Sequence, residues 1–318
     1  MQFSHFSVKE YLTSDRLARS SGDVSRYHIV LEPAHTILAQ ACLGVLLRLD
    51  DRVDDDNVGD IPLVKYAAQY WFDHAQFEKV ASRIRDAMEY FFDADKPHWA
   101  AWCRVQMIDK QWLEFIPEEL NDTFPLYYAS LGGFYDLAEH LVGKHLEHIN
   151  AMGGEMGSPL VAALRGKHFK VAELLHRNGA DVDVRDRQED TPLCEACRYG
   201  VSDVAQWLLN HGADANAQGC WNGSPLRLAA YLGHLKEVQM LLEHNADIHI
   251  RSNAGWTPLH SAASADSRRN QADIMQVLLD HGAIIDAEDD EGRTPLQLAL
   301  KEGHDNNATW LKEHGATR

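Results

Sequence analysis

The stretch Thr257-Pro258-Leu259-His260-Ser261-Ala262 (TPLHSA) has the pattern of a helix start. A threonine hydroxyl before a helix can accept a hydrogen bond from the first free backbone N–H groups. Proline suits the first helical position, because the N–H that it lacks would have had no partner there. The small alanine lets a neighbouring helix approach closely. The stretch therefore predicts a short capped helix that packs tightly against another helix.

The same pattern occurs six times. Pro-Leu pairs begin at positions 125, 159, 192, 225, 258 and 295, so the spacings are 34, 33, 33, 33 and 37 residues. An alanine stands four positions after each proline, and a Gly-Ala or Asn-Ala pair ends most units. A single such unit cannot bury its apolar face, and only a stack of units is stable. A leucine that should fill the seam between the two helices of a unit also recurs, at Leu141, Leu175, Leu208, Leu241, Leu278 and Leu311.

This unit resembles the ankyrin repeat, which is about 33 residues long and carries T-P-L-H-x-A. The stretch 257–262 matches in full, whereas the other units vary the histidine position. The resemblance implies an all-α solenoid with short β-hairpin tips over residues 121–318, preceded by a helical segment over residues 1–120. It also implies a non-catalytic module that binds a protein partner. The expected repeats are 122–155, 156–188, 189–221, 222–254, 255–291 and 292–318.

Two units depart from the pattern. The fifth has about four extra residues within Ser264–Asn270, which predicts a protruding polar loop, because insertions in repeat arrays fall in loops. The sixth carries Asn306, Asn307 and Lys312 at places that are apolar elsewhere. A polar outer face of this kind is typical of a terminal capping repeat.

The first 120 residues have a different pattern. Residues 34–49, after Pro33, read as a helix that is apolar almost all round, and residues 63–92 have a helical period that predicts two helices. The acidic run 50–57 between them lacks the glycine and glutamate of a calcium-binding loop and is interpreted as a solvated turn. Three tryptophans are expected to pack the junction with the first repeat, namely Trp99, Trp102 and Trp112.

The order of these segments resembles the C-terminal part of fungal NACHT–ankyrin proteins, which are nucleotide-switched signalling ATPases of the STAND class. The residues that carry the resemblance are Phe3, His5, Ser7, Glu10, Tyr11, the Glu32–His35 stretch (EPAH) and the stretch 66–77 (YAAQYWFDHAQF). The resemblance places residues 1–120 at the end of a winged-helix region and its linker. It makes His5 a remnant of a nucleotide contact.

The chain contains no G-x-x-x-x-G-K-[ST] motif, so nothing in it is expected to cradle phosphates. We therefore expect no enzyme and no cofactor. The formal charge of −18 opposes nucleic-acid binding. No apolar run approaches the roughly eighteen residues of a membrane span, and the first residues lack a secretory signal, which predicts a cytoplasmic protein with the nucleus left open. Five scattered cysteines suit a reducing compartment.

Two patterns invite a metal hypothesis. Cys194 and Cys197 have C-x-x-C spacing, but both occupy ordinary repeat positions and are interpreted as packing residues. Four histidines recur at one place in successive units, about 8–10 Å apart if helices pack normally, which is too far to share an ion. They are expected to make loop-stabilising hydrogen bonds, and no metal is expected. The four are His211, His244, His281 and His314.

Ankyrin proteins resemble one another in binding through the hairpin tips and the concave face of the first helices. Trp221 and Trp256 stand at predicted tips as interface anchors, unless each indole folds back onto its hairpin. The acidic hairpin 286–291 is interpreted as a solvated loop, with steering of a basic partner as the alternative. The predicted protein-binding residues are Arg187, Gln188, Asp190, Trp221, Asn222, Asn253, Trp256, Asp290, Glu291 and Arg293.

The sequence thus favours a recognition platform that serves as the sensor or scaffold part of a NACHT-type signalling system. Two alternatives stay open. One is part of a STAND ATPase switch whose phosphate-binding domain lies upstream or on another chain. The other is a substrate-receptor subunit of a ubiquitin ligase. The identity of the partner and the oligomeric state are not encoded in any motif that the chain carries.

Overall fold

The computed structural model defines an all-α repeat structure. Within the described residues, isolated bridges such as the one between Gly219 and Gly223 are the only extended pairing. The chain divides into two compact units, which are Met1–Gly154 with Lys170–Leu174 (unit 1) and Glu155–Phe169 with Leu175–Arg318 (unit 2). The described residues are 31–49, 63–77, 79–93, 98, 101–102, 125–153, 157–186, 188–219, 223–266 and 270–317.

Unit 1 contains the helices of the front segment and the first repeat. Its elements are α3 (Leu31–Leu46), α4 (Val64–Ala75), α5 (Val80–Arg83), α6 (Arg85–Phe91), α8 (Pro125–Leu131), α9 (Tyr135–Lys144) and the 3₁₀ turn η4 (Leu146–His148). The prediction of two helices over 63–92 was wrong, because the chain leaves the helical path after Ala75 and again at Ile84. Helix α3 begins before Pro33, which lies in the first turn, where its missing N–H has no helical acceptor.

An aromatic cluster forms the core of unit 1. The fully buried Trp71 has its ring centroid 5.3 Å from that of Phe91 and 6.0 Å from that of Trp102. Phe134 of the first repeat lies 6.2 Å from Trp71, and Trp102 meets Tyr128 edge-on at 5.0 Å. The predicted junction role is confirmed for Trp102. The other two tryptophans, the acidic run 50–57 and His5 lie outside the described residues.

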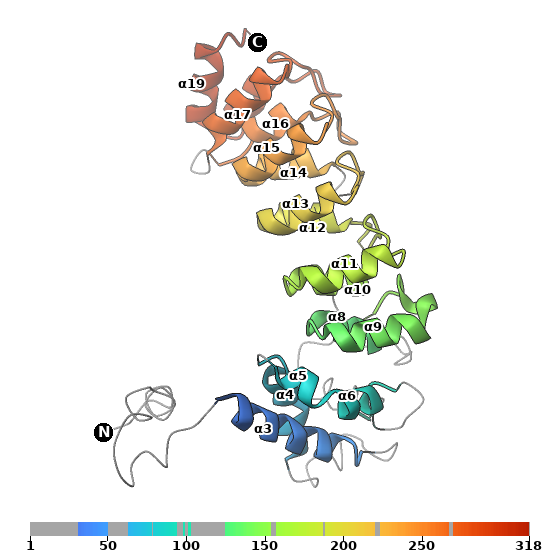
Figure 1. Cartoon of the computed structure of the whole chain (residues 1–318). Helices are drawn as coiled ribbons and strands as arrows, with labels where there is room; N and C mark the ends of the chain where they lie inside the picture. Colours follow the sequence, from blue (N-terminus) through green and yellow to red (C-terminus); the bar gives the residue numbers. More distant parts are fainter. Residues whose placement is uncertain are drawn as a thin grey trace, which may run out of the picture. The chain divides into compact units, whose positions relative to one another are not determined.

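Unit 2 is a stack of helix pairs (Figure 1). The first helices of the pairs lie on one another in the order α12, α14, α16, α18, and the second helices α13, α15, α17 and α19 do the same. The bounds are α10 (Pro159–Arg165), α11 (Phe169–Arg177), α12 (Pro192–Tyr199), α13 (Ser202–Asn210), α14 (Pro225–Leu232), α15 (Leu235–Glu243), α16 (Pro258–Ala263), α17 (Gln271–Asp280), α18 (Pro295–Lys301) and α19 (Asp305–Glu313).

The repeated residues do what their chemistry predicts. In repeats two to six a Ser or Thr side chain accepts a hydrogen bond from the third backbone N–H of the helix, with Pro in the first turn. The alanine four places after each proline is buried in all six repeats, and so is the recurring leucine of each second helix. The residue before each closing alanine has a left-handed backbone, with φ of 93° at Gly179 and 62° at Asn245. All four recurring histidines bond through Nδ1 to the carbonyl four residues earlier, which confirms the predicted role.

Asn307 corrects the prediction of a polar outer face in the sixth repeat. Asn306 and Lys312 are exposed as expected, but Asn307 is buried. Its side-chain amide donates to the carbonyls of Ala263 and Ala265 at 3.1 and 2.8 Å. The cause lies in the fifth repeat, where α16 is only six residues long and ends in carbonyl groups that need donors.

The insertion of the fifth repeat begins with two buried residues, Ser264 and Ala265. That it protrudes as a polar loop stays a prediction, because residues 267–269 lie outside the described residues. After it, Gln271 is buried and donates from Nε2 to the carbonyl of Tyr231 in the preceding repeat at 3.3 Å.

Replacing Asn307 with Ala should lower the free energy of unfolding by about 1–3 kcal/mol, because buried carbonyls lose their donor. The neighbouring exposed change Asn306→Ala should stay within about 0.5 kcal/mol of the parent. Urea unfolding followed by circular dichroism measures both. Equal midpoints for the two variants would contradict the role assigned to Asn307.

Candidate protein-binding surface

The hairpin tips are closed in a regular way. At each tip a backbone N–H bonds to a carbonyl four residues later, as in Asp186 to Asp190 (3.0 Å) and Asp289 to Arg293 (2.9 Å). At three of these tips the side chain of the first residue also accepts two backbone N–H groups of the same tip, whereas the tip at 219–223 begins with Gly219, which has no side chain. Asp186 accepts from Gln188 and Asp190, Ser252 accepts from Ala254 and Trp256, and Asp289 accepts from Glu291 and Arg293.

Arginines tie successive tips together. Arg185 Nη1 donates to the carbonyl of Gln218 at 2.6 Å, and Arg251 Nη1 donates to the carbonyl of Glu288 at 3.0 Å. The two arginines hold the same place in their repeats, seven residues before the proline. Arg251 also reaches the carboxylate of Asp290 at 2.9 Å. The tips therefore form a connected edge with defined spacing, as recognition by a rigid surface requires.

Gly255 is required by this connection. Its backbone has φ of 75°, and a Cβ there would lie 2.3 Å from Asp290 Oδ1 and 2.5 Å from Arg251 Nη2. Those two atoms form the link between the tip at residues 252–256 and the tip at residues 289–293. The glycine therefore allows the close approach of the two tips.

His260 anchors the last described tip. Its Nδ1 accepts the backbone N–H of Thr257 at 3.2 Å, so the proton lies on Nε2, which donates to the carbonyl of Arg293 at 3.0 Å. Burial holds the pKa of His260 below its ordinary value, against the opposing effects of the Arg293 carbonyl and the Asp289 carboxylate. The neutral imidazole thus joins the helix cap of repeat five to the tip of repeat six.

Two predicted binding residues, Asp190 and Arg293, are engaged in ion pairs that involve a buried carboxylate. Asp190 is buried and pairs with Arg198. Arg293 pairs with Glu291 and with the fully buried carboxylate of Asp289 at 2.8 Å. Burial would raise the pKa of Asp289, but its hydrogen bonds from Arg293 and Glu291 outweigh burial and lower it.

The remaining predicted residues divide into three groups. Gln188, Asn253, Asp290 and Glu291 are exposed at the tips. Trp256 is half-buried, and its indole N–H is enclosed with no hydrogen-bond partner among the described residues. The indole is thus partly covered by the protein. Arg187, Trp221 and Asn222 lie outside the described residues.

Two exposed tyrosines were missed by the sequence prediction. Tyr199 is 65% exposed and Tyr231 is 43% exposed, at the C-terminal ends of the adjacent helices α12 and α14. The tips precede the N-terminal ends of the same helices, so the tyrosines extend the surface along the helices. The two tyrosines stand seven and six residues after the prolines of their repeats, so no shared place in the repeat pattern marked them.

The two cysteines of the C-x-x-C pattern do not pair with each other. Both are fully buried, and Cys194 packs against Leu228 of the next repeat, as a packing role predicts. Cys197 is a free thiol whose pKa is raised by burial. Cys194 is disulfide-bonded, whereas the scattered cysteines were interpreted as suiting a reducing compartment.

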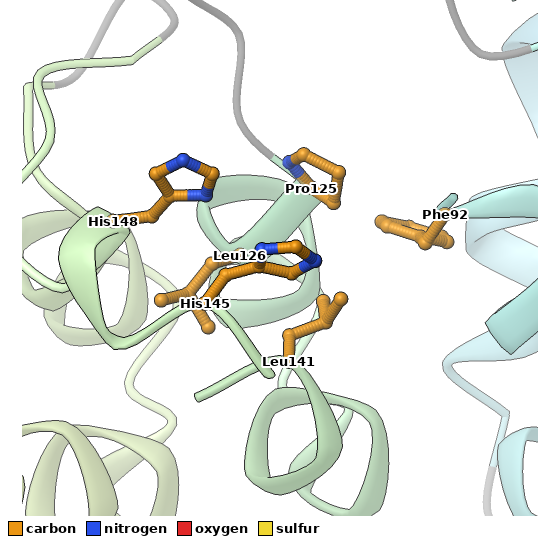
Figure 2. A pocket seen from close by; sticks show the side chains of 6 residues that line it. All are labelled: Phe92, Pro125, Leu126, Leu141, His145 and His148. Carbon is orange, nitrogen blue, oxygen red and sulfur yellow. The ribbon is translucent and has the colours of Figure 1, made fainter. Parts of the chain in front are cut away.

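A small pocket lies in unit 1 (Figure 2). It is about 30 Å³ in volume, which is room for one or two water molecules and not for an organic ligand. His145 and His148 lie at its rim over apolar side chains. A third donor, Glu147, stands between them in the sequence, and the three form a possible metal-binding group.

The geometry of the described residues defines the class of protein. Stacked helix pairs with tips linked by arginines form a solenoid that presents an extended surface. The chain matches the family model for ankyrin repeats (3 copies) at residues 126–219, 159–252 and 226–317. It belongs to the ankyrin repeat family. Ankyrin repeats generally bind protein partners, so the fold indicates a protein-interaction module.

Solved and curated proteins agree with this family. An ankyrin repeat domain from Acinetobacter baumannii AYE has a crystal structure with a TM-score of 0.53 and 32% identity, covering 61% of this chain and 98% of that one. "Azaphilone pigments biosynthesis cluster protein L" of Monascus ruber is 32% identical over 196 residues, which are 57% of this chain and 41% of the relative. A putative ankyrin repeat protein of Rickettsia felis is 41% identical over 68 residues, or 21% of this chain and 30% of the relative. The chain thus spans less than half the length of these curated relatives.

None of the described helices has the length and apolar character that crossing a bilayer requires.

Replacing His260 with Gln should make stability less dependent on pH. Gln297 shows that glutamine at this place keeps the helix cap, since its Oε1 accepts the N–H of Thr294 at 3.1 Å. Because the folded pKa of His260 is depressed, its contribution is present above the unfolded pKa of about 6.5 and is lost as the pH falls toward the folded pKa. Urea unfolding from about pH 7 to about pH 5 should therefore show a steeper loss in the parent than in the variant. Parallel pH profiles would show that His260 is not responsible.

Proposed function

We propose that the chain is a non-catalytic protein-recognition module whose partner contacts the hairpin tips and the exposed ends of the first helices. The observation that supports this most directly is the exposure of Tyr199 and Tyr231 on two adjacent, tightly stacked helices. Tyrosine offers a large apolar ring and a polar hydroxyl, and it is enriched among the residues that dominate binding energy. The packed helices fix both side chains at their base, which lowers the entropy lost on binding.

The tips supply a polar rim to this surface. Gln188 and Asn253 offer amide groups, and Asp290 and Glu291 offer carboxylates that are exposed but paired with Arg251 and Arg293. Arg187, Trp221 and Asn222 remain part of the proposed surface on the strength of the repeat register, with Trp256 as a half-exposed contributor. A rim of carboxylates on a chain of charge −18 favours a partner with basic side chains and disfavours nucleic acid.

Within a cell, we assign this module to the sensor or scaffold part of a NACHT-type signalling system in the cytoplasm. The support is the order of segments in the sequence and the fungal origin of the relative from Monascus ruber. Residues 1–120 would then be the end of a winged-helix region and its linker, and residues 121–318 the six repeats. A genomic reading frame upstream of Met1 that encodes a phosphate-binding loop would support this assignment, and a stop codon directly upstream would oppose it.

Changing both Tyr199 and Tyr231 to Ala should weaken partner binding by about tenfold or more, since truncating a dominant interface residue costs at least about 1–2 kcal/mol. The partner would first be identified by affinity capture from the native host with the parent chain as bait. Titration calorimetry with the purified partner then measures the loss. Both side chains are largely exposed, so the circular dichroism spectrum should not change.

Ile284→Ala is the matched control, because Ile284 is 60% exposed in the same unit but lies outside the first helices and the tips. It should bind like the parent. If the double variant and the control bind equally well, the tyrosine surface is not the site. If the parent chain captures no protein specifically, the proposal of a recognition module loses its support.

A further inference from the structure

The turn near the end of the first repeat, directly after α9, contains three side chains that can act as metal ligands. His145 directly precedes the 3₁₀ turn η4, which contains Glu147 and His148. Residues three apart in a 3₁₀ turn lie one above the other. This explains why the rings of His145 and His148 stack, with centroids 5.3 Å apart and an interplanar angle of 13°. The backbone bond from His148 N–H to the His145 carbonyl, at 3.1 Å, holds the turn in this form.

The donor atoms lie close enough to share one ion. One ligand atom from each of the three residues lies within 4.8 Å of the other two. His145 Nδ1 and Glu147 Oε1 are 3.3 Å apart. Two ligands that each lie about 2.0–2.1 Å from a tetrahedral zinc ion are separated by about 3.3 Å, so this pair already has the required spacing. The side chains of His145 and Glu147 are 48% and 66% exposed. This exposure leaves room for both side chains to rotate until their donor atoms share one ion with His148.

The chemistry of the donors selects the class of ion. Two imidazoles and one carboxylate suit zinc and its transition-metal neighbours, whereas calcium and magnesium prefer oxygen ligands alone.

The surroundings suit an ion with bound water. The two imidazoles stand beside each other at the rim of the small pocket, which is lined by Phe92, Pro125, Leu126 and Leu141 (Figure 2). An apolar wall next to three ligands limits competition from other protein donors. The pocket volume of about 30 Å³ admits water beside the group, and the exposure of His145 and Glu147 also opens the remaining coordination position to solvent.

We propose that His145, Glu147 and His148 bind a single zinc ion, with water completing the coordination, and that the ion fixes the turn that follows α9. The three ligands lie within four consecutive residues of one turn, so the site needs no second chain and no folding change elsewhere. It is independent of the protein-recognition surface and would stand if that surface were disproved.

Titration of the full-length chain with zinc chloride, followed by calorimetry, tests the site. The parent should show one class of binding that saturates at one equivalent. Since loss of a group that merely supports a metal ligand weakens binding about 10–100-fold, His145→Ala or His148→Ala should weaken it at least about tenfold. His249→Ala is the matched control, because it removes one exposed imidazole from unit 2 and should leave the binding unchanged.

Cobalt substitution separates this site from the cysteines. Cobalt bound by His145, Glu147 and His148 should give a visible tetrahedral spectrum without the thiolate charge-transfer band, and the spectrum should vanish in His148→Ala. The proposal is overturned if no class saturates at one equivalent, if a thiolate band appears, or if the histidine variants bind zinc as the parent does. Retained helical circular dichroism in each variant excludes loss of fold as the cause.

Discussion

Backbone groups at the edge of one repeat find their hydrogen-bond partners in the next repeat, and the rest of the structure depends on this constraint. His260 bonds to the carbonyl of Arg293. A second series joins the loops, since side chains of Asp183, Asn216 and Asp286 each accept the backbone N–H found 31 residues later. The His260 imidazole is buried, so loss of its partner in the next repeat would be costly, whereas the series between the loops is exposed and adds regular links from repeat to repeat. Together these bonds fix the spacing of the tips and loops that they join, and thereby the shape that a partner meets.

The features that follow from local chemistry could be predicted from the sequence. The caps at Thr191 and Thr257, the packing alanines and leucines, and the histidine bonds to carbonyls depend on residues within one turn or one repeat. Asn307 could not be predicted, because its burial depends on how α16 ends in the preceding repeat. The front segment has no repeat register, so the breaks at Ala75 and Ile84 had no signal in its periodicity.

The candidate surface was predictable in place and not in detail. The repeat register located the tips. It could not show that Asp190 and Arg293 form ion pairs with buried carboxylates, whereas Asp290 stays exposed. Tyr199 and Tyr231 look like ordinary helix residues in the sequence, because exposure is a property of the stack. The turn at 145–148 was hidden for a similar reason, since three donors become a group only when a 3₁₀ turn superimposes two of them.

The short helix α16 has a consequence for how the array can change its length. Repeat proteins commonly gain or lose whole units, and each cut must leave an end that water or a polar cap can cover. Here the carbonyls of Ala263 and Ala265 are served by a side chain from the sixth repeat. Removing that repeat alone would strip donors from the fifth. The fifth and sixth repeats therefore depend on each other structurally. We expect recombination between such arrays to transfer them together.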